Sequence, residues 1–552
     1  MDKRKENSIE QSMGRIVNFR PVFCIACFLI LGILVGYLRI VDEQPIWIAV
    51  LIVLALPLVA GVLFRGKTRF IAYLVLFYLF FFIGFTSFSL ATANHRDAPT
   101  FNGEYVVCGT VVEKNVQSYG GEVVLTNLSI GGEEVAGKLT FRLYDGDFAA
   151  VDFCDRITAS MQVNTANAVE GAYGFRAEAI ANRELYRGSE PTWYRVDGVE
   201  FRLGAFLRGR LQNALYTGMS EENAAVAVAI LLGNTSGIEE GLLENVRYGG
   251  VAHIFAVSGL HIGAAFAFCL LLFRDKRVPA PIRFLFIVAI LLLYGGVCGY
   301  SASVVRATVT CLVLYGCSLL GMKYDGLESL SLAACVVLLI YPTLLFGVGA
   351  QLSFGACLGI VLLSRPLNRA MSGAVYGVFK WVKHTLLGVP KPPKPNMFKG
   401  NTLPKPLPWQ AVDKVISFLS VSMAAQLATA PILYLSFGYF SVISLLLNCL
   451  FVPMITLGFS PLLVFAMVGA FFPPSLLPTV FYLPNLLLGA STLLFHIFDF
   501  SSGVIRELHL LPQSVICYYA ALIFCTDKIN FCKWQKRTVA ATFAVCCIIT
   551  LL

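Results

Sequence analysis

The sequence predicts a polytopic α-helical membrane protein, with about 11–13 transmembrane helices plus re-entrant segments, into which a small all-β exported domain is inserted. Three observations predict this architecture. The 552 residues are 57% hydrophobic and only 14% charged, with a mean hydropathy of +0.73, which is not typical of a soluble globular protein. Apolar runs of about 18 residues or more recur along the chain. One long stretch, residues 91–200, instead has the composition of a soluble domain.

The first segment, residues 1–90, is predicted to hold a cytoplasmic tail and three transmembrane helices. Residues 1–20 carry five basic side chains, which the positive-inside rule keeps in the cytoplasm. The predicted spans are Pro21–Ile40, Pro45–Phe64 and Phe70–Leu90. Because the first apolar run lacks a small-residue cleavage site, we interpret it as an anchor and not as a removed signal peptide. Three crossings place the following domain outside.

Residues 91–200 are predicted to form a small β-barrel. Five β-rich runs are separated by turns that contain Gly and Asp, a spacing that favours a barrel. These runs are Glu104–Glu113, Glu122–Ile130, Val135–Tyr144, Asp152–Val163 and Tyr173–Ala181. Cys108 and Cys154 are its only cysteines, and an oxidising compartment would allow a disulfide that closes a loop of roughly 46 residues and stabilises by about 4 kcal/mol. Two free buried thiols are the alternative.

Residues 201–250 are predicted to form interfacial and re-entrant helices. Phe201–Leu215 is basic and weakly amphipathic, as expected of a helix at the outer membrane interface. Ser220, followed by two glutamates, predicts a helix start, and Gly233 predicts its end. The helix Ala224–Leu232 is apolar but too short to span a bilayer, so it is either re-entrant or buried outside the membrane, with Gly233 and Asn234 at its tip.

The stretch Val251–Gly263, which reads Val-Ala-His-Ile-Phe-Ala-Val-Ser-Gly-Leu-His-Ile-Gly, opens an apolar run long enough to cross a bilayer. At helical pitch His253 and His261 would lie about 80° apart, and Ser258 would lie one turn from His261. The following Gly259 would loosen the helix. Since polar groups at membrane depth are costly unless they face protein or water, this segment is predicted to line a wet cavity.

Downstream apolar runs continue the membrane domain, residues 251–552. The predicted spans are Ile282–Tyr300, Val304–Leu320, Leu327–Leu345, Phe346–Leu363, 414–436, Tyr439–Leu457, Leu477–Ile497 and Leu511–Cys525, with Leu462–Phe472 as a re-entrant segment and Thr538–Leu552 as a last apolar segment. A basic, Pro-rich loop at 364–410 is predicted to be cytoplasmic, because eight basic and no acidic residues lie between Arg365 and Lys405.

Three polar side chains fall inside these spans. Arg306 either snorkels to the interface or contacts a phosphate, for which a guanidinium is well matched. Gln351 either joins helices by hydrogen bonds or lines a conduit, and Asn448 is a further polar group at depth. Gly233, Gly259, Gly263 and Gly299 are predicted as structural hinges.

The string His-Ile-Phe-Ala-Val-Ser-Gly-Leu-His-Ile, together with Leu232-Gly233, Gly249-Gly250 and Arg306-Ala307, resembles the signature of the ComEC family of DNA-uptake channels. The resemblance implies that the exported barrel is OB-like and that Arg306 contacts phosphate. Asn234 stands where the family commonly has Asp, whereas Gln426, Pro431, Asn448 and Pro453 fit its pattern.

The resemblance also implies partners and a missing domain. The implied partners are single-stranded DNA, an extracytoplasmic DNA receptor with type IV pilus-like uptake machinery, and cytoplasmic helicase or single-strand-binding proteins. Many family members continue into a β-lactamase-like domain with a metal-binding motif, which we do not find here, so we expect nuclease activity to come from another protein. Whether the barrel binds DNA stays open, because its 16 acidic residues outnumber 9 basic ones.

The leading functional prediction is an inner-membrane channel for single-stranded DNA, lined by His253, Ser258, His261, Arg306, Gln351 and Asn448. From residue 251 onward, about 20 Lys and Arg oppose 7 Asp and Glu, which favours a polyanion. No Walker motif or zinc-ligand pattern occurs, so no cofactor, metal or enzymatic activity is expected. The alternatives are a small-solute permease and, less favoured, an intramembrane serine hydrolase that uses Ser258 and His261.

Overall fold

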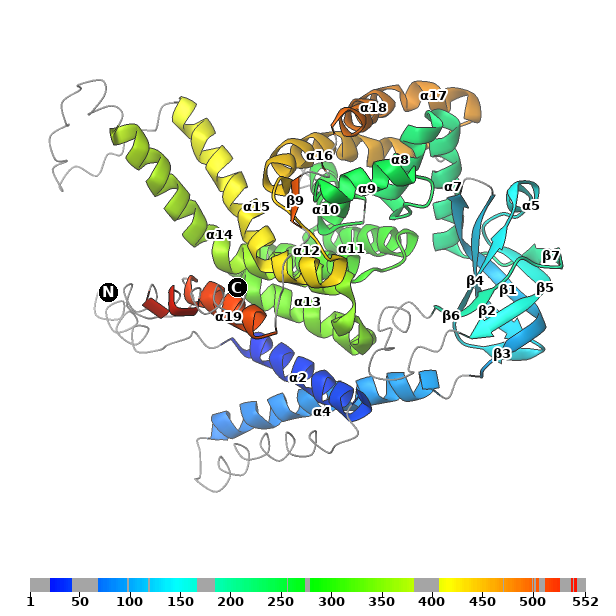
Figure 1. The fold of residues 1–552 in the computed structure, drawn as a ribbon, viewed down its shortest axis with the longest axis horizontal. Helices are drawn as coiled ribbons and strands as arrows, with labels where there is room; N and C mark the ends of the chain where they lie inside the picture. The colour runs from blue at the N-terminus through cyan, green and yellow to red at the C-terminus, as the bar shows by residue number, and fades with distance from the viewer. Residues whose placement is uncertain are drawn as a thin grey trace. The chain divides into compact units, whose positions relative to one another are not determined.

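The computed structural model describes most of the chain, and its helices and strands are drawn in Figure 1. The described residues are 20–41, 68–96, 99–117, 120–165, 184–255, 257–273, 278–381, 407–469, 471–498, 500, 503–505, 512–526, 538–539 and 541–543. Four predictions lie wholly or mostly outside them: the span Pro45–Phe64, the strand Tyr173–Ala181, the centre of the basic loop and the segment Thr538–Leu552.

The chain divides into two compact units, which are described separately. Unit 1 comprises residues 1–19, 355–450 and 503–552, and unit 2 comprises residues 20–354 and 451–502. Unit 2 contains the β-barrel and most of the described helices. Helix α14 (Val348–Trp381) and helix α16 (Ser444–Gly469) each contribute residues to both units.

Six described helices are long and apolar enough to cross a membrane. They are α2 (Pro21–Val41), α4 (Thr68–Arg96), α11 (Ala280–Val297), α12 (Ala302–Leu319), α14 and α15 (Leu407–Phe437). Shorter apolar helices are α10 (Gly259–Leu272), α13 (Gly326–Ile340) and α19 (Pro512–Phe524). The predicted class, a helical membrane protein with an inserted small β-barrel, is therefore confirmed.

Helices α2 and α4 pack through glycines. A β-carbon at Gly32 would overlap the carbonyl oxygen of Phe81, and one at Gly84 would overlap that of Leu29, so the two backbones approach as closely as small residues allow. At the start of α2, Arg20 forms an ion pair with Asp325, the N-cap of α13, at 3.0 Å between Nη2 and Oδ2. This contact fixes the α2–α4 pair to α13.

Five strands of the inserted domain close into a barrel. The ring order is β1 (Asn102–Gln117), β2 (Gly120–Ile130), β4 (Lys138–Leu143), β6 (Glu184–Gly188) and β5 (Asp155–Thr165), which pairs back with β1. Only the β4–β6 pairing in this ring is parallel. The short β3 (Glu133–Val135) pairs with β2, and β7 (Trp193–Val199) pairs with β5. A five-stranded Greek-key barrel is the architecture of the OB fold.

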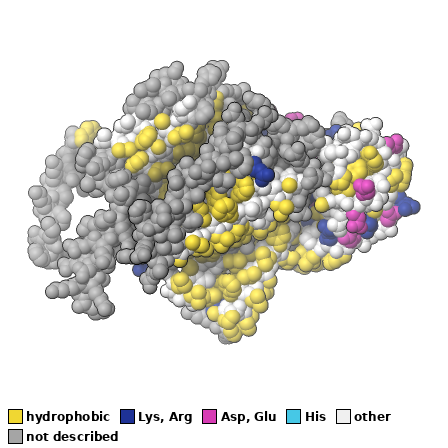
Figure 2. All heavy atoms as spheres, turned by 90° about the horizontal axis from the view of Figure 1, so that it is seen from below, with side chains coloured by type: hydrophobic (Ala, Val, Ile, Leu, Met, Phe, Trp, Pro, Cys, Tyr) yellow, Lys and Arg dark blue, Asp and Glu magenta, His cyan; other side chains and the backbone are white. Residues whose placement is uncertain are grey.

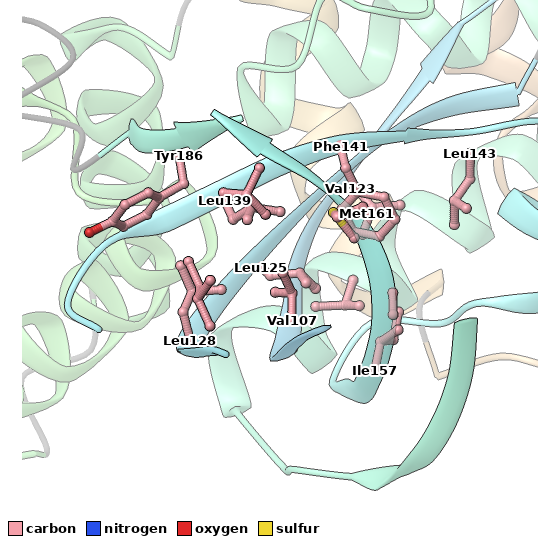
Figure 3. Packing of buried hydrophobic residues seen from close by; sticks show 14 of the residues in the cluster. Val107, Val123, Leu125, Leu128, Leu139, Phe141, Leu143, Ile157, Met161 and Tyr186 are labelled. Carbon is pink, nitrogen blue, oxygen red and sulfur yellow. The ribbon is translucent and has the colours of Figure 1, made fainter. Parts of the chain in front are cut away.

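Alternating side chains of these strands fill the barrel, as Figure 3 shows for Val107, Leu125, Phe141 and Met161. Each of these four residues is at most 2% exposed. Helix α5 (Asp145–Ala150), between β4 and β5, contributes Phe148 to the same core. The outward positions carry charge. On the face drawn in Figure 2, acidic and basic side chains gather on the barrel, and hydrophobic side chains predominate where described helices are visible. The period-2 pattern thus specifies which face is core.

The predicted disulfide between Cys108 and Cys154 is not formed, because the barrel register separates the two residues. Cys108 lies on β1 opposite Thr158, whereas the backbone N–H of Cys154 donates to Val111 O, three residues further along β1. Three residues of strand correspond to about 10 Å, which exceeds the reach of a disulfide. Both side chains are free thiols.

Three helices follow the barrel: α7 (Leu203–Gly218), α8 (Glu221–Leu232) and α9 (Glu240–Tyr248). The predicted limits of α8 are confirmed, since Ser220 is its N-cap and Gly233 its C-cap in the left-handed conformation, with φ +75°. Ten of its twelve residues are buried, so the short apolar helix is enclosed by protein. Helix α9 was not predicted from the sequence.

Three predictions after residue 340 are wrong. Residues 364–381, which we expected to begin the basic loop, belong to α14, because this helix continues through Pro366 with apolar residues at helical spacing. The span Tyr439–Leu457 and the re-entrant Leu462–Phe472 form the single helix α16, whose apolar sequence bridges Gly458. The span predicted at Leu477–Ile497 is two helices, α17 (Leu477–Val480) and α18 (Tyr482–Ile497).

Several short elements connect the helices. They are the 3₁₀ turns η1 (Ala252–Ile254), η2 (Pro342–Phe346) and η4 (Pro474–Leu476) and the strand pair β8 (Phe440–Ser441) and β9 (Val504–Ile505). Within unit 1, Pro431 lacks the N–H that would bond Leu427 O in α15, and the hydroxyl of Tyr518 on α19 donates to that carbonyl at 2.7 Å. The proline in α15 is therefore compensated by a side chain of α19.

Candidate functional site

The central stretch that begins at Val251 is not one helix. Residues Ala252–Ile254 form the turn η1, and α10 begins only at Gly259. Ser258 has extended backbone angles, with φ −106° and ψ 168°, because it is the N-cap of α10. The predicted 80° relationship between His253 and His261 is therefore wrong, and the Ser-Gly pair starts a helix where we expected it to loosen one.

Ser258 and His261 cap the start of α10 together. The Ser258 Oγ accepts a hydrogen bond from Leu260 N at 3.3 Å, and the His261 Nδ1 accepts one from Ser258 N at 3.1 Å. This is a capping box in which an imidazole replaces the usual Glu or Gln. An accepting Nδ1 places the proton of the neutral ring on Nε2. The spacing that suggested a nucleophile and a base is thus used in helix capping.

Arg306, on α12, is buried against the start of α10. Its side chain is 8% exposed, and its guanidinium lies so close to Gly259 that a β-carbon there would overlap Nη2. The Nη1 group donates to the carbonyl oxygen of Ser353 on α14 at 3.3 Å. Ser303, one turn before Arg306, donates to the Ser353 hydroxyl at 2.8 Å. The guanidinium faces protein and joins three helices, in contrast to a snorkelling arginine.

We call Ser258, Gly259, His261, Arg306 and Ser353 the α10-head cluster. It brings together three of the predicted path residues, Ser258, His261 and Arg306. His253 lies just before it on η1 and keeps an exposed side chain, although its neighbours Ile254 and Phe255 are buried. The helices that form the cluster contain no Asp or Glu in their sequences. The cluster therefore offers hydroxyl, imidazole and guanidinium groups, a set suited to an anion.

Two predicted path residues have other surroundings. The side-chain amide of Gln351 donates to Leu345 O in η2 at 3.1 Å, so in this structure it secures the turn that precedes α14. Asn448, on α16, belongs to unit 1 and is 8% exposed. Its Oδ1 is buried and has no hydrogen-bond partner within the described part of the chain.

The four predicted hinge glycines differ in their surroundings. Gly233 and Gly299 adopt positive φ, +75° and +80°, which disfavours any other residue at these turns. Gly259 is required by the close approach of Arg306, whereas a β-carbon at Gly263 would meet nothing within 4 Å. Only Gly233, Gly259 and Gly299 therefore have a structural reason to be glycine.

Sequence reasoning missed the contacts that attach the barrel to the helices. The Nδ2 of Asn234, at the tip of α8, donates to Lys114 O on β1 at 3.2 Å, and its Oδ1 accepts from Ser236. The hydroxyl of Tyr294 on α11 donates to Leu231 O at 3.1 Å near the end of α8, so these two helices are also joined to each other. An amide such as Asn234 supplies both a donor and an acceptor, whereas an ionised Asp would supply acceptors only.

An ion cluster reinforces this attachment. Glu113 on β1 lies 3.3 Å from Lys138 Nζ and 4.0 Å from Arg208 Nη1 on α7. Burial opposes ionisation of Glu113, but the charges of Arg208 and Lys138 outweigh it and hold the pKa of the carboxyl below its ordinary value. The barrel is thus joined to α7 by an ion pair and to the tip of α8 by a hydrogen bond.

Comparisons with known proteins match the part of the chain that follows the barrel. The sequence model of a family described as "Competence protein" matches residues 230–529, more than half of the chain, and this range includes the α10-head cluster. The ComE operon protein 3 of Bacillus subtilis (strain 168) is 27% identical over 240 residues, which cover 44% of this chain and 26% of that protein. The match therefore spans about a quarter of that relative's length. No solved structure gives a significant match.

Proposed function

The chain belongs to the Competence protein family, and on that premise we propose that it is an inner-membrane channel that translocates single-stranded DNA into the cytoplasm during natural transformation. Such a strand is a polyanion, and its passage requires a hydrated route without fixed negative charge. The observation that supports this proposal most directly is the burial of Arg306, which lies on α12 and packs against the start of α10. Neither of these helices contains an acidic residue.

The proposed path passes the α10-head cluster. His253 is exposed and lies just before the cluster, so it would meet the strand, while Arg306 would hold a phosphate through paired N–H groups. Ser258 and His261 would act mainly by holding the start of α10 in place. Gln351 and Asn448 are proposed as further polar positions along the path.

The barrel is proposed to lie on the extracytoplasmic side of the membrane and the N-terminus on the cytoplasmic side. The barrel is fixed to α7 and α8, and its acidic excess disfavours tight contact with phosphate. We therefore propose that it acts as a rigid mount near an extracytoplasmic DNA receptor and type IV pilus-like machinery. Helicase or single-strand-binding proteins would draw the strand in from the cytoplasm, and a separate nuclease would remove its complement.

Reconstitution tests the proposal. The full chain is placed in lipid vesicles, a membrane potential is imposed, and a fluorescent single-stranded oligonucleotide is added outside together with a nuclease. We expect protected oligonucleotide to accumulate in vesicles that hold the native chain and not in vesicles that hold Arg306→Glu. Lys323→Glu, in the loop after α12, is the matched control and should behave as the native chain. Accumulation of small solutes without any protected DNA would favour the permease and overturn the proposal.

A further inference from the structure

An apolar surface patch lies where the barrel joins α7. Its members are exposed although they are large and hydrophobic. They are Val199 (72% exposed), Phe201 (66%), Leu203 (51%) and Phe206 (40%). The rings of Phe201 and Phe206 contact each other, with centroids 5.5 Å apart, so the two side chains form one continuous surface. We call these four residues the junction patch.

The junction patch lies level with the end of a membrane-spanning helix. Gly204, between Leu203 and Phe206, packs so that a β-carbon there would lie 3.1 Å from the carbonyl oxygen of Gly296. Gly296 is in the last turn of α11, which is long and apolar enough to cross a membrane. The depth of the patch is thereby tied to one end of a span, where hydrocarbon gives way to headgroups.

The exposed face of α7 changes character along its axis. Its exposed residues are, in order, Leu203, Phe206, Arg210, Asn213 and Thr217. The helix rises 1.5 Å per residue, so this series extends over about 21 Å. The order is apolar, then cationic, then neutral and polar, which is the sequence of environments from acyl chains through lipid phosphates to water.

The opposite face of α7 is buried and cannot swing away. Arg208 contacts Glu113 of the barrel, and Gly209 packs against the ring of Phe153, where a β-carbon would lie 2.7 Å from Cδ2. Movement of the patch would therefore carry the barrel with it. Because the patch is held rigidly, it is better suited to insertion into a fluid bilayer than to a protein contact that requires it to adapt its shape.

We propose that the junction patch is a membrane anchor that inserts into the boundary between headgroups and acyl chains, with Arg210 at the lipid phosphates. The anchor holds the barrel at a fixed height over the bilayer. Lipid is the occupant favoured by the continuity of the patch with the end of α11 and by the order of side chains along α7. The proposal does not depend on what the channel carries.

Photocrosslinking tests the anchor. A benzophenone amino acid replaces Phe206 in the full chain, which is reconstituted in vesicles of phosphatidylethanolamine and phosphatidylglycerol and irradiated. We expect lipid adducts in the mass spectrum. The same amino acid at Thr217, on the same face three turns further on, should give no adduct above background. Equal adducts at both positions, none at Phe206, or crosslinks in cells from Phe206 to another protein would each overturn the proposal.

A second measurement covers the case in which the bulky benzophenone prevents folding. Phe206→Trp keeps an aromatic side chain, and its added fluorescence should be quenched by lipids brominated near the headgroup. Thr217→Trp should show no such quenching. Quenching of both or of neither would argue against an anchor at this position.

Discussion

The guanidinium of Arg306 lies directly against Gly259, the first residue of α10, so that no β-carbon fits between them. A buried cation is thereby placed at the positively polarised end of a helix, an arrangement that is unfavourable by itself. A phosphate bound beside this pair would interact favourably with both the guanidinium and the helix end. The contact between Arg306 and Gly259 explains why a glycine follows Ser258 at the start of α10.

Substitution of Gly259 tests this contact. Gly259→Ala should displace the guanidinium and reduce DNA entry strongly, although alanine is a good helix former. Gly263→Ala is the matched control, because it adds a methyl group in open space on the same helix. It should leave uptake unchanged and stabilise the protein by about 0.5–1 kcal/mol. Uptake of labelled DNA measures the first effect, and thermal unfolding in detergent measures the second. Equal uptake by the two variants would contradict a role for the contact between Gly259 and Arg306.

Arg306 is expected to act through its charge and its fork of donors. Arg306→Glu should abolish DNA entry while the protein still folds, because a carboxylate is tolerated at a helix start. Arg306→Lys should retain part of the activity, since an ammonium keeps the charge but cannot form paired bonds to a phosphate. Transformation frequency and the amount of inserted protein are measured together. Normal transformation by folded Arg306→Glu would refute the phosphate contact.

Ser258 is expected to act as a helix cap. Ser258→Ala should cost about 1 kcal/mol of stability, and Ser258→Asn should restore most of it, because both Ser and Asn accept a bond from the first turn. Uptake should follow stability in this series. A hydrolase would instead lose all activity in Ser258→Asn and would react with serine-directed phosphonates in the native form. Such labelling at Ser258 is the result that our assignment does not allow.

The attachment of the barrel should depend on pH through Glu113. Its pKa in the folded chain is below the ordinary value of about 4.5, so the stabilisation is complete above that value and is lost as the pH falls through the lower folded pKa. Glu113→Gln should therefore lower the melting temperature at neutral pH, and the difference from the native chain should shrink in acid. Glu133→Gln, at an exposed position of β3, is the control. A difference that does not change with pH would exclude the ion cluster as its cause.

Much of the fold could be predicted from local signals. The span Pro21–Ile40 is within one residue of α2, and Ser220 and Gly233 delimit α8 as predicted, because apolar length and capping residues act locally. The start of α10 could not be predicted in this way. Its cap lies inside a continuous apolar run, so composition hides the break at Ser258.

The candidate site could be predicted only in part. The cost of polar groups at membrane depth predicts Ser258, His261 and Arg306 as site residues, and the structure brings them together. The contact of Asn234 with Lys114 and the salt bridge between Glu113 and Arg208 could not be predicted, because they join segments far apart in the sequence. The strand register that separates Cys108 from Cys154 could not be predicted for the same reason.

The most direct test asks whether DNA in transit touches the segment before α10. A photoreactive amino acid is placed at His253, which is exposed on η1, and at Leu271, which is 68% exposed near the far end of α10. Cells are irradiated during uptake of labelled DNA, and the chain is recovered under denaturing conditions. We predict a DNA adduct at position 253 and none at position 271. Active uptake without any adduct at position 253 would contradict the proposed path.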